Sequence, residues 1–215
     1  MRIALIHALA HSVAPINEAF ERDWPEAQRM NLLDDSLSAD LAASGRGLDA
    51  AMHERFMRLG RYAVDTGADG ILFTCSAFGP CIEAVARAHA PMPVLKPNEA
   101  MIDEAAQGEG PLGLIATFAA TLQSMPPEFP PGITLQTALA AGALEALDAG
   151  DTTRHDALIA EQAAALAARG CTRIALAQFS MARARAACEA ASGRPVLTTV
   201  DSAVRALRRR LLKPN

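Results

Sequence analysis

Cys75 is the residue of this sequence best suited to chemistry, because of the segment Phe73-Thr74-Cys75-Ser76-Ala77-Phe78-Gly79-Pro80 around it. The apolar residues before Cys75 predict a strand, and Pro80 marks the start of a helix. Backbone N–H groups of such a turn, with the helix dipole, can bind a carboxylate and lower the pKa of a thiol. A thiolate there can transfer a proton or attack carbon. The alternative is a buried structural cysteine.

Thr117, Thr121 and His7 follow other apolar runs. Thr117 and Thr121 lie four residues apart, so one helical turn brings both hydroxyls to the same side of a ligand. Thr117 as a simple N-cap is the competing interpretation. His7 ends the first apolar run and can hydrogen-bond a substrate carboxylate or shuttle a proton, although a lone histidine is more often structural.

An internal repeat relates Cys75 to Gln178. The segment Gly67–Ser76 aligns without gaps on Gly170–Phe179, and both follow an alanine-rich helical pattern. The alignment predicts two halves related by a pseudo-twofold axis, with Cys75 and Gln178 at equivalent strand ends, where open α/β sheets bind ligands. Gln178 can donate and accept hydrogen bonds, but it cannot transfer protons as cysteine does.

Three further polar residues are weaker candidates. Ser180 is the nearest hydroxyl to Gln178, and Asp35 and Asn98 follow the second and fourth expected strands. The alternative for Asp35 is a solvated polar turn, since its neighbours Asp34 and Ser36 are also polar.

Composition excludes several classes of protein. Hydrophobic residues make up 51% of the 215 residues and charged residues 20%, which is a globular balance. The net charge is −4, and Arg208–Arg210 is the only basic run, which disfavours a nucleic-acid groove. No apolar stretch approaches the length of a signal peptide or a membrane span, so we expect no membrane partner.

Cysteine usage and motifs narrow the chemistry further. The four cysteines show no C-x-x-C spacing, which argues against a zinc site and a disulfide scaffold and favours a reducing cytoplasm. Cys81, Cys171 and Cys188 lack polar neighbours and are expected to be structural. No P-loop, G-x-G-x-x-G or G-x-S-x-G motif is present, so no nucleotide cofactor is indicated.

Strand and helix patterns alternate, which predicts an α/β fold with a mainly parallel sheet. Gly67 and Gly170 are expected to end helices, and Thr152 or Thr153 to cap one. Strands are expected at Arg2–Ile6, Gln28–Leu33, Gly70–Thr74, Pro93–Lys96, Pro111–Ala116, Ile133–Thr137, Ile174–Ala177 and Val196–Thr199. Helices are expected at Pro15–Asp23, Met52–Thr66, Pro80–His89, Glu99–Ala106, Ala119–Met125, Ala138–Ala149, Thr153–Arg169, Met181–Ala191 and Asp201–Leu212.

These motifs resemble those of the aspartate/glutamate racemase superfamily, which includes hydantoin racemases, maleate isomerases and arylmalonate decarboxylases. Thr74-Cys75-Ser76 resembles its first cysteine motif, and Gly113–Thr117 with Thr121 resembles its central motif. Leu176–Ala182 falls where the second cysteine motif belongs. A racemase-like sub-branch is also similar at Leu5–His7, Asp34–Leu37 and Lys96–Met101.

The resemblance implies two pseudo-symmetric α/β lobes, with the active site between them. The first lobe would comprise residues 1–97 and 197–215, and the second residues 98–196. It further implies no cofactor and no metal, a small carboxylate-bearing substrate, and a homodimer. Nucleic acid is not an expected partner.

The resemblance also assigns roles to residues. Cys75 matches the first catalytic cysteine, and Ser76, Thr117 and Thr121 match positions that bind substrate carboxylates. Gln178 stands where the second cysteine belongs, and with Ser180 it would line the opposite wall, with His7, Asp35 and Asn98 as weaker site residues.

The expected function is therefore a cofactor-independent, aspartate/glutamate racemase-like enzyme that acts by cysteine acid/base chemistry. Because Gln178 is no acid at neutral pH, symmetric two-thiol racemisation is disfavoured. The alternatives are a one-cysteine decarboxylase or cis–trans isomerase of the same superfamily, and a non-catalytic carboxylate-binding protein.

Overall fold

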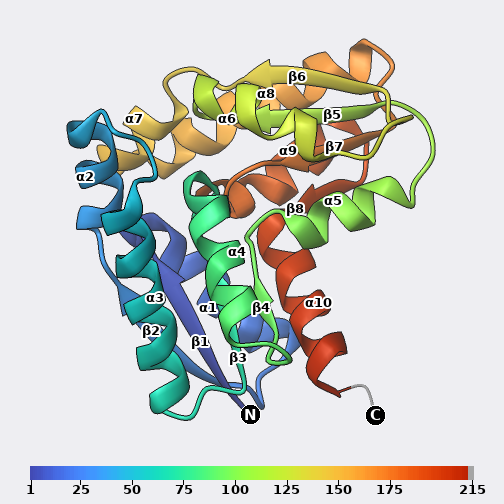
Figure 1. Ribbon diagram of the computed structural model, residues 1–215. Helices are drawn as coiled ribbons and strands as arrows, with labels where there is room; N and C mark the ends of the chain where they lie inside the picture. Colours follow the sequence, from blue (N-terminus) through green and yellow to red (C-terminus); the bar gives the residue numbers. More distant parts are fainter. Residues whose placement is uncertain (213–215) are drawn as a thin grey trace. The chain divides into compact units, whose positions relative to one another are not determined.

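Two parallel sheets organise the computed structural model, which describes residues 1–212 (Figure 1). Each has four strands, in the orders β2-β1-β3-β4 and β6-β5-β7-β8. The chain divides into unit 1, formed by Met1–Glu99 together with the residues from Ala203 onward, and unit 2, formed by Ala100–Ser202. The fold class is thus α/β with parallel sheets flanked by helices, as the alternating patterns predict.

The sheet of unit 1 is buried on both faces. Its strands are β1 (Arg2–His7), β2 (Gln28–Leu33), β3 (Gly70–Phe73) and β4 (Val94–Leu95). In β1 every residue from Ile3 to His7 is buried, which is typical of a parallel strand between two helical layers.

Helices cover the two faces of this sheet. They are α1 (Val13–Asp23), α2 (Ser36–Ser44), α3 (Ala50–Asp65), α4 (Gly79–Ala88) and the end of α10 (Thr199–Leu212). Ile6 and Phe73 pack in one apolar cluster with Phe56 of α3, and α3 lies beside α4 (Figure 1). On the other face α10 packs so closely that a Cβ at Gly70 would lie 3.3 Å from Leu207 Cδ1.

Unit 2 repeats this plan. Its strands are β5 (Leu112–Ala116), β6 (Leu135–Leu139), β7 (Arg173–Leu176) and β8 (Val196–Thr198). Its helices are α5 (Glu99–Ala106), α6 (Ala119–Ser124), α7 (Ala143–Asp148), α8 (Thr152–Ala168) and α9 (Arg185–Ser192). Ile115 packs with α8 and α9, whereas Leu114 packs with α5, so alternate side chains fill two separate clusters.

The internal repeat is confirmed by strand order and register. Ile6 pairs with Phe73 in unit 1, and Ile115 pairs with Leu176 in unit 2. The gap-free alignment also matches the bounds of β3 to those of β7. The helix before each of these strands ends at a glycine with positive φ, Gly67 (80°) and Gly170 (92°), a conformation that favours glycine.

Some local predictions were wrong. The polar turn at residues 34–36 leads into α2, which the sequence patterns missed because its apolar residues are mostly alanines that form no clear stripe along one helix face. The strand predicted at Ile133–Thr137 lies two residues later, at Leu135–Leu139. Asp151, rather than Thr152 or Thr153, caps α8, and its carboxylate accepts a hydrogen bond from the backbone N–H of Arg154.

The predicted helix Met181–Ala191 is instead divided in two. A 3-10 turn, η4 (Phe179–Ala184), comes first and α9 follows it. An equivalent turn, η2 (Ser76–Phe78), follows β3. The remaining 3-10 turns of the described chain are η1 (Ala10–Ser12) and η3 (Pro126–Glu128).

Close packing of α3 against α4 yields a testable prediction at Gly60. A Cβ there would lie 2.5 Å from Val85 Cγ1, a β-branched side chain with little rotamer freedom. Gly60→Ala should lower the free energy of unfolding by about 1–3 kcal/mol from overpacking, offset by roughly 1 kcal/mol from better helix propensity.

A double-mutant cycle measures this effect. The wild type, Gly60→Ala, Val85→Ala and the double variant are each unfolded in urea, and their free energies of unfolding are compared. Gly60→Ala should cost less, or become stabilising, when Val85→Ala is also present. An equal cost in both backgrounds would show that the helix contact is not the cause.

Candidate functional site

Each predicted site residue lies at the C-terminal end of a parallel strand or in the segment that follows it. In unit 1, these residues are His7, Asp35, Cys75, Ser76 and Asn98. In unit 2, they are Thr117, Thr121, Gln178 and Ser180. The structure therefore gathers the candidates at one edge of each sheet, the edge where open α/β sheets bind ligands.

The thiol of Cys75 has one polar and one apolar side. The backbone N–H of Ala77 and the hydroxyl of Ser38, in α2, are the polar groups that hydrogen-bond to the sulfur, and the Ser38 Oγ also lies 3.4 Å from the Ala8 carbonyl oxygen. On the other side a narrow apolar cavity lies against the thiol, with no room for a water molecule. Its lining residues are Ile6, His7, Ala8, Leu37, Phe56, Phe73, Cys75 and Phe78.

Burial raises the pKa of the Cys75 thiol, while the Ala77 N–H and the Ser38 hydroxyl lower it by a smaller amount. The expectation of a lowered thiol pKa was therefore wrong. The physical reason is the apolar cavity wall, which cannot solvate a thiolate. The two hydrogen bonds to the sulfur stabilise the thiolate by less than this lost solvation destabilises it. Cys75 is thus a protonated thiol at neutral pH, and it is partly exposed.

His7 is fully buried, and both of its ring nitrogens are hydrogen-bonded. Nδ1 lies 2.9 Å from Thr74 Oγ1, and Nε2 lies 3.0 Å from Asn31 Oδ1. Asn31 in turn exchanges amide hydrogen bonds with Asn17 of α1. Burial lowers the pKa of His7, with the Asn31 hydrogen bond opposing, so the ring is neutral at neutral pH. This arrangement holds Thr74, the residue next to Cys75, and a substrate contact for His7 stays a prediction.

Asp35 is exposed and forms the N-cap of α2 without a side-chain capping bond. Its neighbour Asp34 is the carboxylate that the fold uses. Asp34 accepts hydrogen bonds from Nε and Nη2 of Arg55, at 3.0 and 2.7 Å, and from Ser36. The guanidinium and the hydroxyl hold the pKa of Asp34 below its ordinary value, against the opposing effect of burial. This network anchors the start of α2, the helix that carries Ser38.

Asn98 is 3% exposed, and its Oδ1 has no hydrogen-bond partner within residues 1–212. Asn98 lies in the turn between β4 and α5, three residues after the strand ends at Leu95. Asn98 therefore offers an unused acceptor at the same sheet edge as the thiol.

Thr117 and Gln178 meet at the corresponding edge in unit 2. Gln178 Oε1 accepts hydrogen bonds from the backbone N–H of Thr117, at 2.7 Å, and from its Oγ1, at 2.9 Å. Thr117 is not the N-cap of α6, since that position is Phe118. Its hydroxyl is turned to Gln178 instead.

Three predicted hydroxyls remain available to a ligand. Those of Ser76, Thr121 and Ser180 form no hydrogen bond with any residue that the structure describes. Thr121 is 9% exposed, and the two serines are half-buried. All three are hydroxyls that can donate to a carboxylate.

The other cysteines lie in the apolar cores. Cys81, Cys171 and Cys188 are completely buried. Burial, with the nearby carboxylates of Asp156 and Glu189, raises the pKa of Cys188 to about 12.

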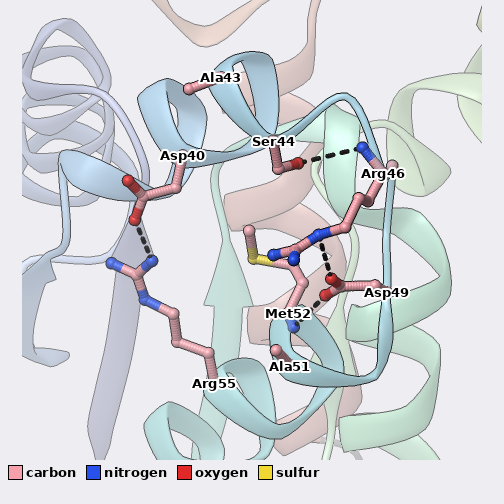
Figure 2. Close-up of a pocket in the computed structure, with 9 residues that line it drawn as sticks. Asp40, Ala43, Ser44, Arg46, Asp49, Ala51, Met52 and Arg55 are labelled. Carbon is pink, nitrogen blue, oxygen red and sulfur yellow. Dashed lines mark hydrogen bonds and ion pairs between the residues drawn. The ribbon is translucent and has the colours of Figure 1, made fainter.

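A wider pocket of about 380 Å³ lies between α2 and α3 and contains none of the predicted site residues (Figure 2). Its charged groups neutralise one another. Arg55 pairs with Asp40 at 2.6 Å, and Arg46 pairs with Asp49 at 3.0 Å (Figure 2). The pocket therefore presents no unpaired charge for a substrate carboxylate.

The part of the chain that the structure describes contains neither a metal-binding cluster nor a membrane-spanning helix. Within residues 1–212, no three His, Cys, Asp or Glu side chains are grouped as metal ligands. None of the helices in this part of the chain has the length and apolar character needed to cross a bilayer.

The structure thus defines an α/β fold of two parallel sheets, with a thiol at a strand end of unit 1 and hydrogen-bonding side chains at strand ends of both units. The sequence matches the Asp/Glu/hydantoin racemase family over residues 10–207, and the chain belongs to this family. No curated protein sequence matches it.

Solved racemase structures share the fold over nearly the whole chain. Allantoin racemase from Klebsiella pneumoniae is 17% identical, with a TM-score of 0.70 and coverage of 100% of this chain and 94% of that one. An aspartate racemase homologue from Pyrococcus horikoshii OT3 is 12% identical, with a TM-score of 0.76 and 99% of each chain covered. Glutamate racemase from Thermus thermophilus is 19% identical, with a TM-score of 0.71, covering 100% and 83%.

Sequence reasoning missed two residues that shape the site. Ser38 follows no motif, and only the path of α2 brings it to Cys75. Asn31 left no clear signal, because it is one of three polar residues in the edge strand Gln28–Leu33 and is itself exposed. In the folded chain its Oδ1 lies 3.0 Å from Nε2 of the buried His7.

The environment of Cys75 predicts an alkylation profile. In the folded protein, iodoacetamide should modify Cys75 before the three buried cysteines, and the rate should still rise with pH above the ordinary thiol pKa of about 8.5. Ser38→Ala removes a hydrogen bond to the thiolate, so labelling at pH 8 should slow by about tenfold.

Ser44→Ala is the matched control, since Ser44 lies in the same helix but bonds the Leu41 carbonyl. Mass spectrometry of quenched samples follows each cysteine separately. An inflection below the ordinary thiol pKa, or equal rates in both serine variants, would contradict this account of the thiol.

Proposed function

We propose that this member of the racemase family is a cofactor-independent enzyme that uses Cys75 as its acid/base on a small carboxylate substrate. The observation that carries the proposal is the partly exposed thiol at the C-terminal edge of a parallel sheet, hydrogen-bonded to Ala77 N–H and Ser38. The relatives whose structures share the fold carry the names of allantoin, aspartate and glutamate racemases. A reducing compartment, which we take to be the cytoplasm, suits a free reactive thiol.

The raised pKa of Cys75 favours proton delivery over proton removal. A thiol that is protonated at neutral pH can protonate a carbanion directly, and it abstracts a proton only through its minor thiolate form. The hydroxyl of Ser38 stabilises that thiolate by a hydrogen bond, so a fraction of the thiolate can still form. This observation supports a second candidate function, a decarboxylase with one catalytic cysteine.

In that reaction the bond between the substrate carbon and one carboxylate breaks, and CO2 leaves. The electron pair remains on the carbon, which takes the proton of Cys75, and water then reprotonates the thiolate. Hydrogen-bond donors that stabilise the charge on the retained carboxylate lower the barrier. We propose that the free hydroxyls of Ser76 in unit 1, and of Thr121 and Ser180 in unit 2, donate hydrogen bonds to substrate oxygens. Asn98, His7 and Asp35 are weaker proposed contacts.

Two-sided racemisation has less support. The residue equivalent to Cys75 in unit 2 is Gln178, which cannot give or take a proton at neutral pH. We therefore expect a proton to be exchanged on one face of the substrate carbon only.

Proton exchange in D2O, followed by NMR, tests the proposal. The substrates would be amino and hydroxy acids, hydantoins, and diacids of the malonate and maleate types. Cys75-dependent loss of an α-proton signal with retained chirality is the expected result for a substrate with an acidic α-proton. Turnover should fall by at least about 10²-fold in Cys75→Ala, which is the usual contribution of a catalytic acid/base.

Cys81→Ala, the same chemical change at a buried core cysteine, is the matched control and should retain turnover. Release of CO2 from a malonate would identify the decarboxylase, and conversion of maleate an isomerase that adds the thiolate to a double bond. Inversion of chirality would show that a second acid exists. Turnover that survives in Cys75→Ala would refute the role of Cys75, and binding without any turnover would indicate a carboxylate-binding protein.

A further inference from the structure

The contact between Thr117 and Gln178 determines how the glutamine amide is oriented. A backbone N–H can only donate, so the side-chain atom 2.7 Å from the Thr117 nitrogen must be the oxygen, Oε1. The Thr117 hydroxyl donates to the same oxygen at 2.9 Å. The amide nitrogen, Nε2, must therefore lie on the side of the amide group away from these donors.

The contact also changes which groups are free at this strand end. Both donors of Thr117 are already used, so they are not available to a substrate carboxylate. Gln178 is half-buried, and its Nε2 forms no hydrogen bond with any described residue. The two N–H bonds of Nε2 are thus the unused donors of this pair.

We propose that Gln178 is the substrate-binding donor at the β7 end and that Thr117 is the positioning residue that orients it. In this arrangement Nε2 donates to a carboxylate or carbonyl oxygen of the substrate, so the group recognised here is an acceptor and not an ammonium. The assignment of a carboxylate substrate rests on the proposed function. The orientation of the amide does not, because it follows from the two distances.

Orientation by Thr117 has a physical advantage. A glutamine side chain has three rotatable bonds, and ordering it only when the ligand binds would weaken binding. Two hydrogen bonds to Oε1 order the side chain beforehand. A neutral donor also stabilises charge that develops on a substrate oxygen without competing for the proton.

A different arrangement of the same residues makes the opposite prediction. If the substrate carboxylate displaced Gln178 and bound Thr117 directly, then removing the glutamine side chain would free two donors. Gln178→Ala would tighten carboxylate binding in that case. Under our proposal the same variant weakens it, so the sign of the change decides between the two.

The experiment is an NMR titration of the full chain labelled with 15N. The side-chain amide of Gln178 is assigned as the 1H–15N pair that is missing in Gln178→Ala. Sodium malonate, sodium maleate, L-aspartate and L-glutamate are the probes. We expect at least one to shift this pair saturably, and its Kd to rise about tenfold in Gln178→Ala, as for loss of a hydrogen bond to a charged group.

Two substitutions separate donation from positioning. Gln178→Glu keeps the oxygen that Thr117 binds but replaces the donor by a repelling carboxylate, so binding should weaken further than in Gln178→Ala. Thr117→Val keeps the backbone N–H and removes the hydroxyl, so Kd should rise by a smaller factor while the Gln178 amide pair broadens. Gln123→Ala, at an exposed glutamine of the same unit, is the control and should bind like the wild type.

The proposal is overturned if none of the four probes shifts the Gln178 pair, or if Gln178→Ala binds as well as or better than the wild type. Melting temperatures of all variants identify any that fail to fold. Cys75→Ala distinguishes a failure of the proposed function from a failure of the role of Gln178, since it should abolish turnover and leave the Gln178 shift intact. A Gln178 shift with turnover independent of Cys75 would refute the proposed function and support the present inference.

Discussion

The contact between the Cys75 thiol and an aromatic wall determines the protonation state of the thiol. Phe56 stacks on Phe73 with ring centroids 5.4 Å apart and lies 4.8 Å from Phe78, and all three rings line the cavity beside the sulfur. An apolar surface cannot solvate a thiolate, so the neutral thiol dominates. The same rings are the core that holds α3 against the sheet of unit 1. Stability of the fold and protonation of the thiol therefore depend on the same packing.

Helix α2 supplies the opposing polar contact. Arg55 holds the start of this helix through Asp34 and Asp40, and Ser38 reaches the thiol from the first turn. The hydroxyl restores part of the solvation that the aromatic wall removes. Because Arg55 lies in α3, the helix that also carries Phe56, one element positions both the apolar and the polar side of Cys75.

The two units place different side chains at equivalent positions of the same backbone plan. Cys75 and Gln178 both have extended backbone conformations, with φ of −125° and −131°, and both precede a 3-10 turn. The side chains differ in what they bind. The thiol lies against a core, whereas the amide is held by the two donors of Thr117. Membership of the racemase family follows from the sequence match over residues 10–207, but it does not define the reaction, since one fold supports many activities.

The sequence alone determined the alternating α/β plan, the internal repeat and the equivalence of Cys75 with Gln178. These features depend on local patterns, such as apolar runs and the glycines that end α3 and α8, which short-range sterics enforce. A repeated pattern of apolar residues also implies a repeated strand register, because equivalent strands in each half must bury equivalent side chains. The motifs around Cys75 and Thr117 were sufficient to identify the family.

Only the tertiary structure decided the protonation of Cys75 and the hydrogen-bond partner of Thr117. The pKa of a thiol depends on groups that come from distant parts of the chain, here Ser38 and Phe56, and no spacing along the sequence encodes their distance. The same holds for the hydrogen bonds between Thr117 and Gln178, which join residues 61 positions apart. Solvation and hydrogen bonding act over a few ångströms in space, so they are determined only once the chain has brought these groups together.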